Sequence, residues 1–226
     1  MKINVQKTKT MVVRWDGCGV VNITIDGQRI EQVKSYKYLG SIISEDGRSN
    51  TDVKVRIALA KEAFNKRKEL LTKELSRKLK KRMVKVLIWP VVLYGCETWT
   101  LLKEERDRLQ ALEMWVWRGL EKISWNDKIS NEKVLERVNK KNCLVTTIIQ
   151  RKKNWIGHVM RGDGLLRDVL EGKMLGKKRA GKPREGMITD LKKELEHTWC
   201  DEMKRKDEGK ELKDLKKEFG KKCLKR

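Results

Sequence analysis

Apolar and polar residues alternate over much of the first 45 positions, which is the pattern of short strands with one buried face. Val21–Ile25 follows this alternation, and Asp26-Gly27 comes next as a hairpin turn in which the glycine can take a positive φ. A further apolar run at 38–43 ends at the turn signal Glu45-Asp46-Gly47. The pattern predicts an antiparallel meander of three or four strands.

The period of the apolar residues changes from two to about 3.6 after residue 51, which indicates amphipathic helices. Pro90 bends or ends the second of them, because proline lacks the backbone N–H that a helix interior needs. Trp115 and Trp117 lie about 200° apart on the third helix and cannot both face the core. The predicted helices begin near Asp52, Leu75, Lys103, Ser130 and Cys143.

The fold class expected from these elements is α+β, with a short β-meander followed by a mostly helical bundle and a basic C-terminal tail. Beyond the bundle, the Gly-rich basic segment 176–184 is expected to be a loop, and the apolar residues after it suggest two more helices, the last of them marginal. The predicted regions are the meander at 1–48, the helical domain at 49–161 and the basic, partly flexible region at 162–226.

The charge of the chain favours a polyanionic partner. The 226 residues include 55 Lys and Arg against 32 Asp and Glu, a formal net charge of +23. Phosphates relieve the self-repulsion of such a surface, so nucleic acid is the first candidate partner. Eight Trp residues argue against a wholly disordered chain, because disordered chains lack large aromatic residues to bury.

Cysteine usage and hydropathy predict an intracellular protein. The five cysteines include no Cys-x-x-Cys pair, which is typical of reduced thiols. No apolar segment near the N-terminus has the form of a signal peptide, and no run of about 18 apolar residues occurs that could span a membrane. The basic segment 176–184 could equally serve as a nuclear localisation signal.

The residues show no catalytic or metal-binding constellation. His158 and His197 belong to no His-Cys spacing typical of zinc sites, and each is expected to be an ordinary helix histidine. The sequence has no Walker loop, no Gly-x-Ser-x-Gly motif and no paired-Asp strand. We therefore expect no metal site, no cofactor and no small-molecule substrate.

Cations concentrate between Lys66 and Lys85, where ten Lys and Arg stand against two Asp and Glu. On an amphipathic helix pair this stripe could follow a phosphate backbone, although a solvated helix face would show the same composition. Further clusters at 151–153 and 177–184 favour contact with nucleic acid. The candidate cations are Lys66, Arg67, Lys73, Arg77, Lys78, Lys81, Arg82, Lys152, Lys153, Lys177, Lys178, Arg179, Lys182 and Arg184.

The tryptophans are expected mostly in the core. Trp99, Trp115, Trp125 and Trp155 lie near apolar helix positions, where burial is more common than a role in base stacking. Trp15, next to Asp16-Gly17, is expected to be exposed. Only an exposed Trp could stack on a base.

Four blocks of sequence, read in order, resemble the C-terminal portion of a reverse transcriptase from a non-LTR (LINE-type) retrotransposon. Residues 4–9 (Asn-Val-Gln-Lys-Thr-Lys) resemble the stretch that closes the palm, and 36–40 (Tyr-Lys-Tyr-Leu-Gly) resemble the primer-grip motif. Residues 90–99 resemble the Leu-Tyr-Gly-x-Glu-x-Trp signature of the thumb. Residues 155–161 and 179–184 resemble the Gly-His-x-x-Arg and Gly-Arg-Pro blocks beyond it.

The resemblance implies roles for several of these residues. Tyr38, Leu39 and Gly40 would place the primer end, although a strand-core pair would explain Tyr38 and Leu39 as well. Lys7 would lie near the incoming nucleotide of a complete enzyme. The carboxylates that hold paired Mg²⁺ ions in such polymerases lie in strands before the first block, and here Met1 stands just before it. The chain as given is therefore expected not to polymerise.

The leading hypothesis is a truncated, reverse-transcriptase-derived protein that binds nucleic acid non-specifically through basic helices of a thumb-like domain. A second hypothesis is a basic helical interaction module with an acidic protein partner. A third is an incomplete gene model of an RNA-directed DNA polymerase, whose upstream part would restore activity.

Overall fold

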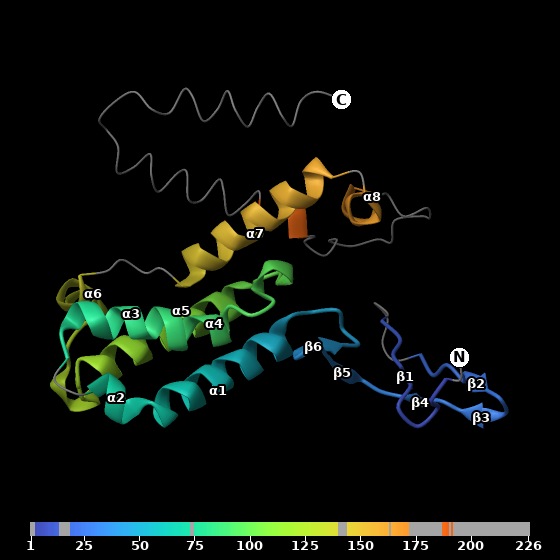
Figure 1. Cartoon of the computed structure of the whole chain (residues 1–226), viewed down its shortest axis with the longest axis horizontal. Coiled ribbons are helices and arrows are strands. Elements are labelled where there is room, and N and C mark those ends of the chain that lie inside the picture. The colour runs from blue at the N-terminus through green and yellow to red at the C-terminus, as the bar shows by residue number, and fades with distance from the viewer. Residues whose placement is uncertain are drawn as a thin grey trace. The chain divides into compact units, whose positions relative to one another are not determined.

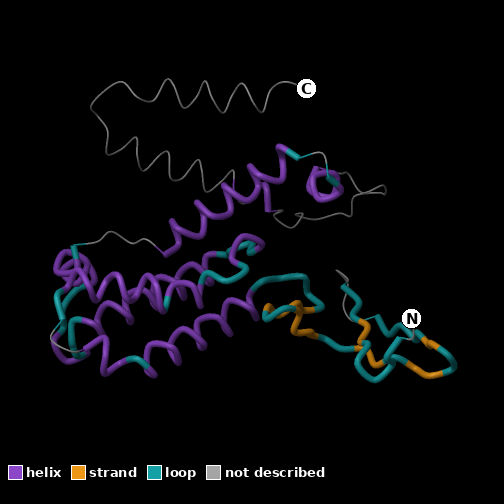
Figure 2. The backbone as a smooth tube through the Cα atoms, viewed as in Figure 1, coloured by secondary structure: helices purple, strands orange, loops and turns teal. Residues whose placement is uncertain are grey.

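The computed structural model describes residues 3–13, 19–72, 75–139, 144–162, 164–171, 187–189 and 191. The chain divides into two compact units, Met1–Met187 and Ile188–Arg226, and the elements below all belong to the first. Short strands come first and helices follow, as the backbone coloured by secondary structure makes plain (Figure 2). The predicted α+β class is confirmed.

Six short strands pair two by two within the described residues (Figure 1). The predicted hairpin at Asp26-Gly27 is present, with both turn residues at positive φ (50° and 75°), which suits the twist of the flanking strands. The six are β1 (Lys9–Thr10), β2 (Thr24–Ile25), β3 (Gln28–Arg29), β4 (Glu31–Gln32), β5 (Ser35–Tyr38) and β6 (Ser41–Ser44).

Two details of the strands differ from the expected meander. β1 pairs with β4 in parallel, a long-range pairing that local alternation cannot indicate. The apolar run at 38–43 is not one strand, because the chain reverses at Leu39 (φ 47°) and Gly40 (φ 88°) and returns antiparallel as β6. Glycine favours a turn with two positive φ values. The apolar residues around Gly40 concealed this turn signal in the sequence.

The helices begin close to the predicted positions. Ser76 and Ser130 cap two of them, each accepting a hydrogen bond from the backbone N–H three residues on. Pro90 lies in the first turn of a new helix, where its missing N–H costs nothing. The described helices are α1 (Asn50–Lys66), α2 (Lys68–Thr72), α3 (Arg77–Leu87), α4 (Trp89–Val92), η1 (Cys96–Thr98), α5 (Lys103–Leu120), η2 (Trp125–Asp127), α6 (Asn131–Val138), α7 (Leu144–Arg161) and α8 (Leu165–Glu171).

Aromatic residues fill much of the helical core. Trp117 is fully buried and packs edge-on against Trp89 with ring centroids 5.7 Å apart. Trp115, on the opposite side of α5, is 36% exposed and packs edge-on against Phe64 at 5.0 Å. The prediction that Trp115 and Trp117 face different directions is confirmed.

The other tryptophan predictions have mixed outcomes. Trp99 is buried as expected, whereas Trp155 is only half-buried. The expectation that Trp115 is a core residue is wrong, since helical geometry turns its side chain away from the buried face of α5. Trp15 and the side chain of Trp125 lie outside the described residues.

A buried carboxylate joins α5 to α7. Glu113 is fully buried and accepts hydrogen bonds from the backbone N–H of Leu144 (3.0 Å) and the indole N–H of Trp117 (3.3 Å). Since an N–H at a helix start has no partner within its own helix, the Leu144 bond fixes where α7 begins. No helix in the described part of the chain combines the length and apolar character needed to cross a bilayer.

Candidate nucleic-acid interface

The turn between β5 and β6 is held from both sides by side chains of the helical domain. Tyr94 donates its hydroxyl hydrogen to the carbonyl of Leu39 (2.5 Å), and Arg56 donates from Nη2 to the carbonyl of Gly40 (2.6 Å). The Arg56 guanidinium also lies over the Tyr94 ring, 4.3 Å from its centroid. Two successive carbonyls of the turn are thus fixed by residues from α1 and from the segment that follows α4.

Asp52 fixes the base of the same hairpin. It is buried, and its Oδ1 accepts from the backbone N–H of Ile42 (2.9 Å) while its Oδ2 accepts from the indole N–H of Trp99 (2.9 Å). The Arg56 Nε lies 4.0 Å from Oδ1. We call Asp52, Arg56, Tyr94 and Trp99 the hairpin clamp.

The hairpin clamp brings together two blocks that lie far apart in the sequence, 36–40 and 90–99. Gly95 permits the close approach, because its φ is 70° and an added Cβ would lie only 3.0 Å from the Ser41 hydroxyl oxygen. No pattern in the sequence predicted that Asp52 and Arg56 would contact the hairpin. The available signal was their spacing of four residues on one helix, which is common among solvated ion pairs.

The hairpin presents aromatic and aliphatic side chains to solvent. Tyr38 is 57% exposed and Leu39 is 74% exposed, so the alternative interpretation of these two residues as a strand-core pair is wrong. The register places Tyr36 opposite Ile43, and both are exposed on the same face as Tyr38. The hairpin clamp uses only the backbone of the turn, which leaves these side chains available for a partner.

Lys7 is exposed in a turn that precedes β1, where its backbone N–H bonds to Asn4. Among the described residues, no hydrogen bond or ion pair joins Lys7 to the β5–β6 turn. The two residue blocks to which the resemblance assigns nucleotide and primer contacts are therefore not linked directly here.

Helix α3 carries the densest positive charge of the described chain. Its eleven residues include Arg77, Lys78, Lys80, Lys81, Arg82 and Lys85 and no Asp or Glu, and only Val84 is buried. At 100° per residue, Lys81, Lys85, Lys78 and Arg82 share a sector of about 100°. We call these four residues the α3 cation face.

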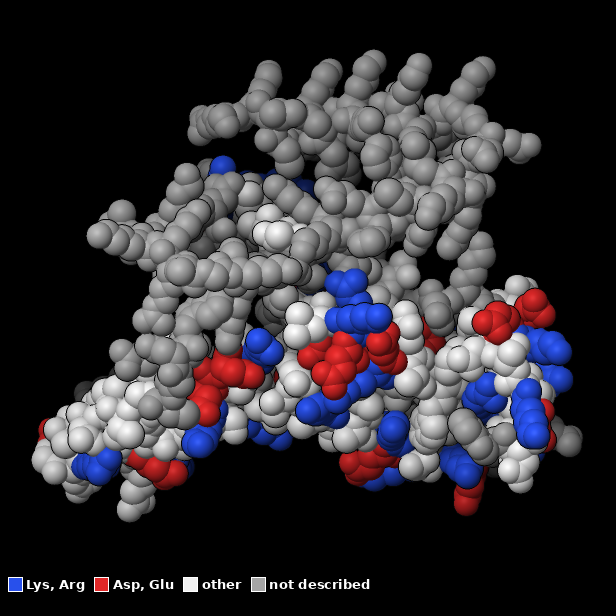
Figure 3. All heavy atoms as spheres, turned by 180° about the vertical axis from the view of Figure 1, so that it is seen from behind, with Lys and Arg blue, Asp and Glu red and all other residues white. Residues whose placement is uncertain are grey.

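The α3 cation face has no carboxylate partner in the part of the chain that the structure describes. Within the described residues, none of its four side chains forms a salt bridge, whereas Arg77 at the start of the helix pairs with Glu121 (3.1 Å). On the face of the molecule seen in Figure 3, the Lys and Arg side chains are interspersed with Asp and Glu.

Two other predicted cations, Lys66 and Arg67, have partners on α1. Lys66 pairs with Glu62 (2.6 Å), and this contact lowers the pKa of the Glu62 carboxyl. Arg67 donates to the Ala63 carbonyl (3.1 Å). Both side chains remain exposed, so they can still reach a polyanion that approaches α1.

The predicted cations on α7 differ from those on α3. Lys152 is only 2% exposed, so its assignment as a phosphate contact is wrong, because a buried ammonium cannot reach a nucleic-acid backbone. Lys153 is half-buried. The remaining predicted cations lie outside the described residues: Lys73, Lys177, Lys178, Arg179, Lys182 and Arg184.

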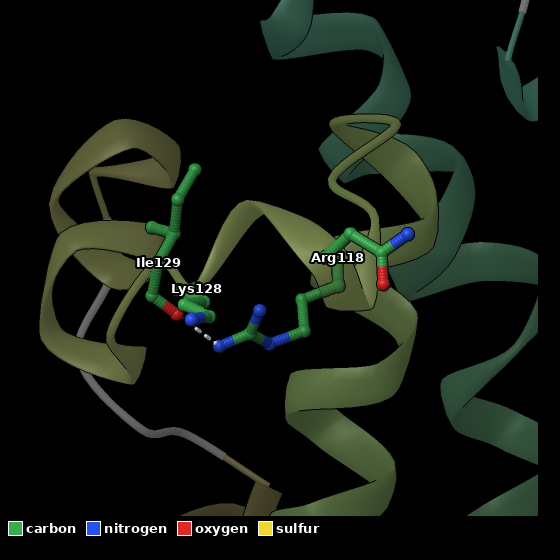
Figure 4. A pocket seen from close by; sticks show the side chains of 4 residues that line it. Arg118, Lys128 and Ile129 are labelled. Carbon is green, nitrogen blue, oxygen red and sulfur yellow. Dashed lines mark hydrogen bonds between the residues drawn. The ribbon is translucent and has the colours of Figure 1, made fainter.

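A hollow lies where the end of α5 meets η2 and the start of α6. Arg118, Asn126, Lys128 and Ile129 line it, and its volume is about 670 Å³. Arg118 extends across it and donates from Nη2 to the Ile129 carbonyl (2.6 Å), as Figure 4 shows. No sequence motif pointed to this hollow, because Arg118 and Lys128 come from different elements.

Within the described residues, no three His, Cys, Asp or Glu side chains come together in a way that could hold a metal ion. His158 is exposed near the end of α7, and His197 lies outside those residues. No protein-family model, curated protein or solved structure matches the chain. The features of the described residues that bear on function are therefore the clamped hairpin and the α3 cation face.

Proposed function

We propose that this protein binds nucleic acid without sequence specificity and that it derives from a reverse transcriptase of the non-LTR retrotransposon type. The binding proposal rests on the α3 cation face, whose four cations form no salt bridge with another described residue. The contact between blocks 36–40 and 90–99 supports the proposed origin, since two of the four resembling blocks meet in one structural unit. The sequence has no Asp-Asp pair for metal-dependent transfer, so binding rather than polymerisation is proposed for this chain.

The cations of the α3 cation face lower the stability of the helix that carries them. Lys78 and Arg82, like Lys81 and Lys85, are four residues apart, and each such like-charge pair destabilises a helix by roughly 0.2–0.5 kcal/mol. Cations in the first turn also oppose the helix dipole. A polyanion laid along the face would remove both penalties. Local costs of this kind are typical of residues that serve a partner.

Phosphate contacts by the α3 cation face have a measurable signature. Each neutralised phosphate of a duplex releases counterions and adds about 0.9 to the slope of log K against log salt. We expect the protein to bind mixed-sequence DNA duplex and RNA–DNA hybrid at ~50 mM salt, with affinity falling steeply as salt rises. Fluorescence anisotropy with labelled duplexes of several sequences measures both the slope and the lack of sequence preference.

A four-residue variant tests whether this face makes the contacts. Replacing Lys78, Lys81, Arg82 and Lys85 by Gln should lower the salt slope by about one for each cation that contacts phosphate. The matched control removes four exposed cations from separate elements: Lys34→Gln, Lys54→Gln, Lys103→Gln and Lys133→Gln. Absence of duplex binding at ~50 mM salt, or equal losses in both variants, would refute the proposal for α3.

One observation favours a second candidate, an acidic protein partner. Leu79 and Val86 are 43% and 62% exposed beside Arg82, and an amphipathic acidic helix could cover these apolar side chains as well as the cations. Nucleic acid does not need the apolar positions. If the double variant Leu79→Ser and Val86→Ser still binds duplex, nucleic acid is the favoured partner. If the protein binds an acidic amphipathic peptide but no duplex, the acidic protein partner is favoured.

A further inference from the structure

We propose that the hollow lined by Arg118, Asn126, Lys128 and Ile129 is a binding site for a phosphate group. The hollow is separate from the α3 cation face, and the phosphate site does not depend on the proposed function. Two cations share one concave surface without a carboxylate partner among the described residues, and one of them is a guanidinium group that is fixed in place with unused donors.

Arg118 is oriented by the protein through one nitrogen only. Its Nη2 donates to the Ile129 carbonyl (2.6 Å) and to the side-chain oxygen of Asn131 (3.0 Å). The three remaining N–H donors, on Nε and Nη1, have no hydrogen-bond partner among the described residues. A guanidinium held in this way is a preorganised fork for two oxygens of one oxyanion.

Lys128 adds a second positive charge to the same hollow. Its side chain is exposed and its backbone is left-handed (φ 47°), a conformation that is uncommon for lysine. Lys128 and Ile129 are adjacent in the chain, and Figure 4 shows Arg118 reaching toward both of them. Two like charges that line one hollow repel each other. A bound anion would attract both cations and so offset this repulsion.

The neighbouring carboxylates are engaged elsewhere. Asp127 accepts a hydrogen bond from the Ser124 backbone N–H (2.6 Å) and so completes the cap of η2. Glu121, one turn after Arg118, pairs with Arg77. Among the described residues, Arg118 and Lys128 therefore have no ion-pair partner.

The start of α6 adds a favourable field. Asn131, which holds Arg118, is the first residue of this eight-residue helix, so the hollow adjoins its positive end. The planar guanidinium fork, the ammonium group and the helix start together favour a tetrahedral dianion over chloride. The phosphate could be free or could belong to a nucleic-acid backbone, because the chemistry of recognition is the same.

Inorganic phosphate is the first probe. Calorimetric titration of the full chain, with phosphate added at constant ionic strength against chloride, should show saturable binding in the millimolar range. Lys128→Gln should weaken this binding about tenfold, because the variant loses a charge-assisted hydrogen bond to the anion. Lys122→Gln is the matched control, because Lys122 is also exposed and left-handed in the segment after α5 but does not line the hollow.

A second variant guards against loss of folding. Arg118→Lys retains the charge but loses the fork, and circular dichroism reports whether α5 and α6 persist. The proposal predicts weaker phosphate binding in this variant with an unchanged spectrum. It is overturned if phosphate gives no saturable signal above chloride, or if Lys122→Gln weakens binding as much as Lys128→Gln does.

Two arms distinguish the sources of the phosphate. If Lys128→Gln weakens the binding of a short oligonucleotide as well as that of inorganic phosphate, the hollow holds a backbone phosphate. If it weakens only the binding of inorganic phosphate, the site takes a free phosphate group. Both results support the site. The variant with a neutralised α3 cation face should still bind inorganic phosphate, so failure of the α3 proposal and failure of this one give different results.

Discussion

Trp99 donates its indole N–H to Asp52 at 2.9 Å, across 47 residues of sequence and in the interior of the protein. The same carboxylate accepts the backbone N–H of Ile42 through its other oxygen. One buried side chain therefore joins the first long helix, the β5–β6 hairpin and the segment after η1. Hydrogen bonds from Asp52, Arg56 and Tyr94 join the hairpin to the helical domain, while many of the hairpin's large side chains are exposed.

Replacing Asp52 by Ala should destabilise the protein strongly. The change leaves a buried indole N–H and a backbone N–H without acceptors, and each unsatisfied group costs about 1–3 kcal/mol. It also removes the only carboxylate partner that the buried Arg56 has among the described residues. We expect the free energy of unfolding, measured in urea, to fall by about 3 kcal/mol or more.

Asp107→Ala is the matched control for this prediction. Asp107 is exposed on α5, and its side chain forms no hydrogen bond or ion pair with another described residue. Its replacement should change the free energy of unfolding by less than about 0.5 kcal/mol. Equal effects of the two substitutions would show that the Asp52 contacts are not what holds the hairpin.

The helical part of the fold could be predicted from the sequence, because its signals are local. The apolar period located α1, α3 and α5, and Ser130 marked the start of α6 through a cap that needs only its next few residues. The partner of Asp52 could not be predicted in this way. Nothing near Asp52 in the sequence distinguishes it from any acidic residue in a first helical turn.

The candidate site was predictable to a smaller extent. The α3 cations could be expected to be exposed because they are dense and lack nearby acids. The run at 151–153 has the same composition, yet Lys152 is buried, because helical geometry turns it toward the interior while Arg151 remains exposed. The hollow at Arg118 depends on how α5 and α6 pack, which composition does not encode.

Tyr94→Phe should loosen the β5–β6 turn without unfolding the helices. The hydroxyl makes one hydrogen bond to the Leu39 carbonyl, whose loss costs about 0.5–1.5 kcal/mol. Amide hydrogen exchange of β6 should become faster, while that of α5 stays unchanged. Tyr36→Phe removes a hydroxyl that forms no hydrogen bond with a described residue, so it should leave both exchange rates as they are. Faster exchange in both variants would contradict the assigned role of Tyr94.

Gly119→Ala tests the packing of α5 against α1. An added Cβ at this position would lie 2.9 Å from an atom of the Phe64 ring, which is buried and edge-packed against Trp115. Overpacking of this kind typically costs about 1–3 kcal/mol. We expect a lower urea midpoint with an unchanged m-value, and Gly164→Ala, where an added Cβ meets nothing within 4 Å, should show no comparable loss.

The Cys96 thiol should make the stability of the protein depend on alkaline pH. Burial, with a smaller contribution from the neighbouring Glu97 carboxylate, raises the pKa of this thiol from 9.0 to about 12. Between these values the unfolded chain loses the thiol proton while the folded chain keeps it. The folded state therefore binds more protons there, and the free energy of unfolding decreases as pH rises through this window.

Comparison with Cys96→Ala isolates this effect, since both proteins share every other titrating group. Urea unfolding at several pH values from about 8 to about 11 should show the wild type losing stability faster than the variant above pH 9.0. Below that pH the two curves should run parallel, offset by the cost of the cavity. Parallel curves over the whole range would mean that the thiol titrates alike in the folded and unfolded chains, contrary to its burial at the start of η1.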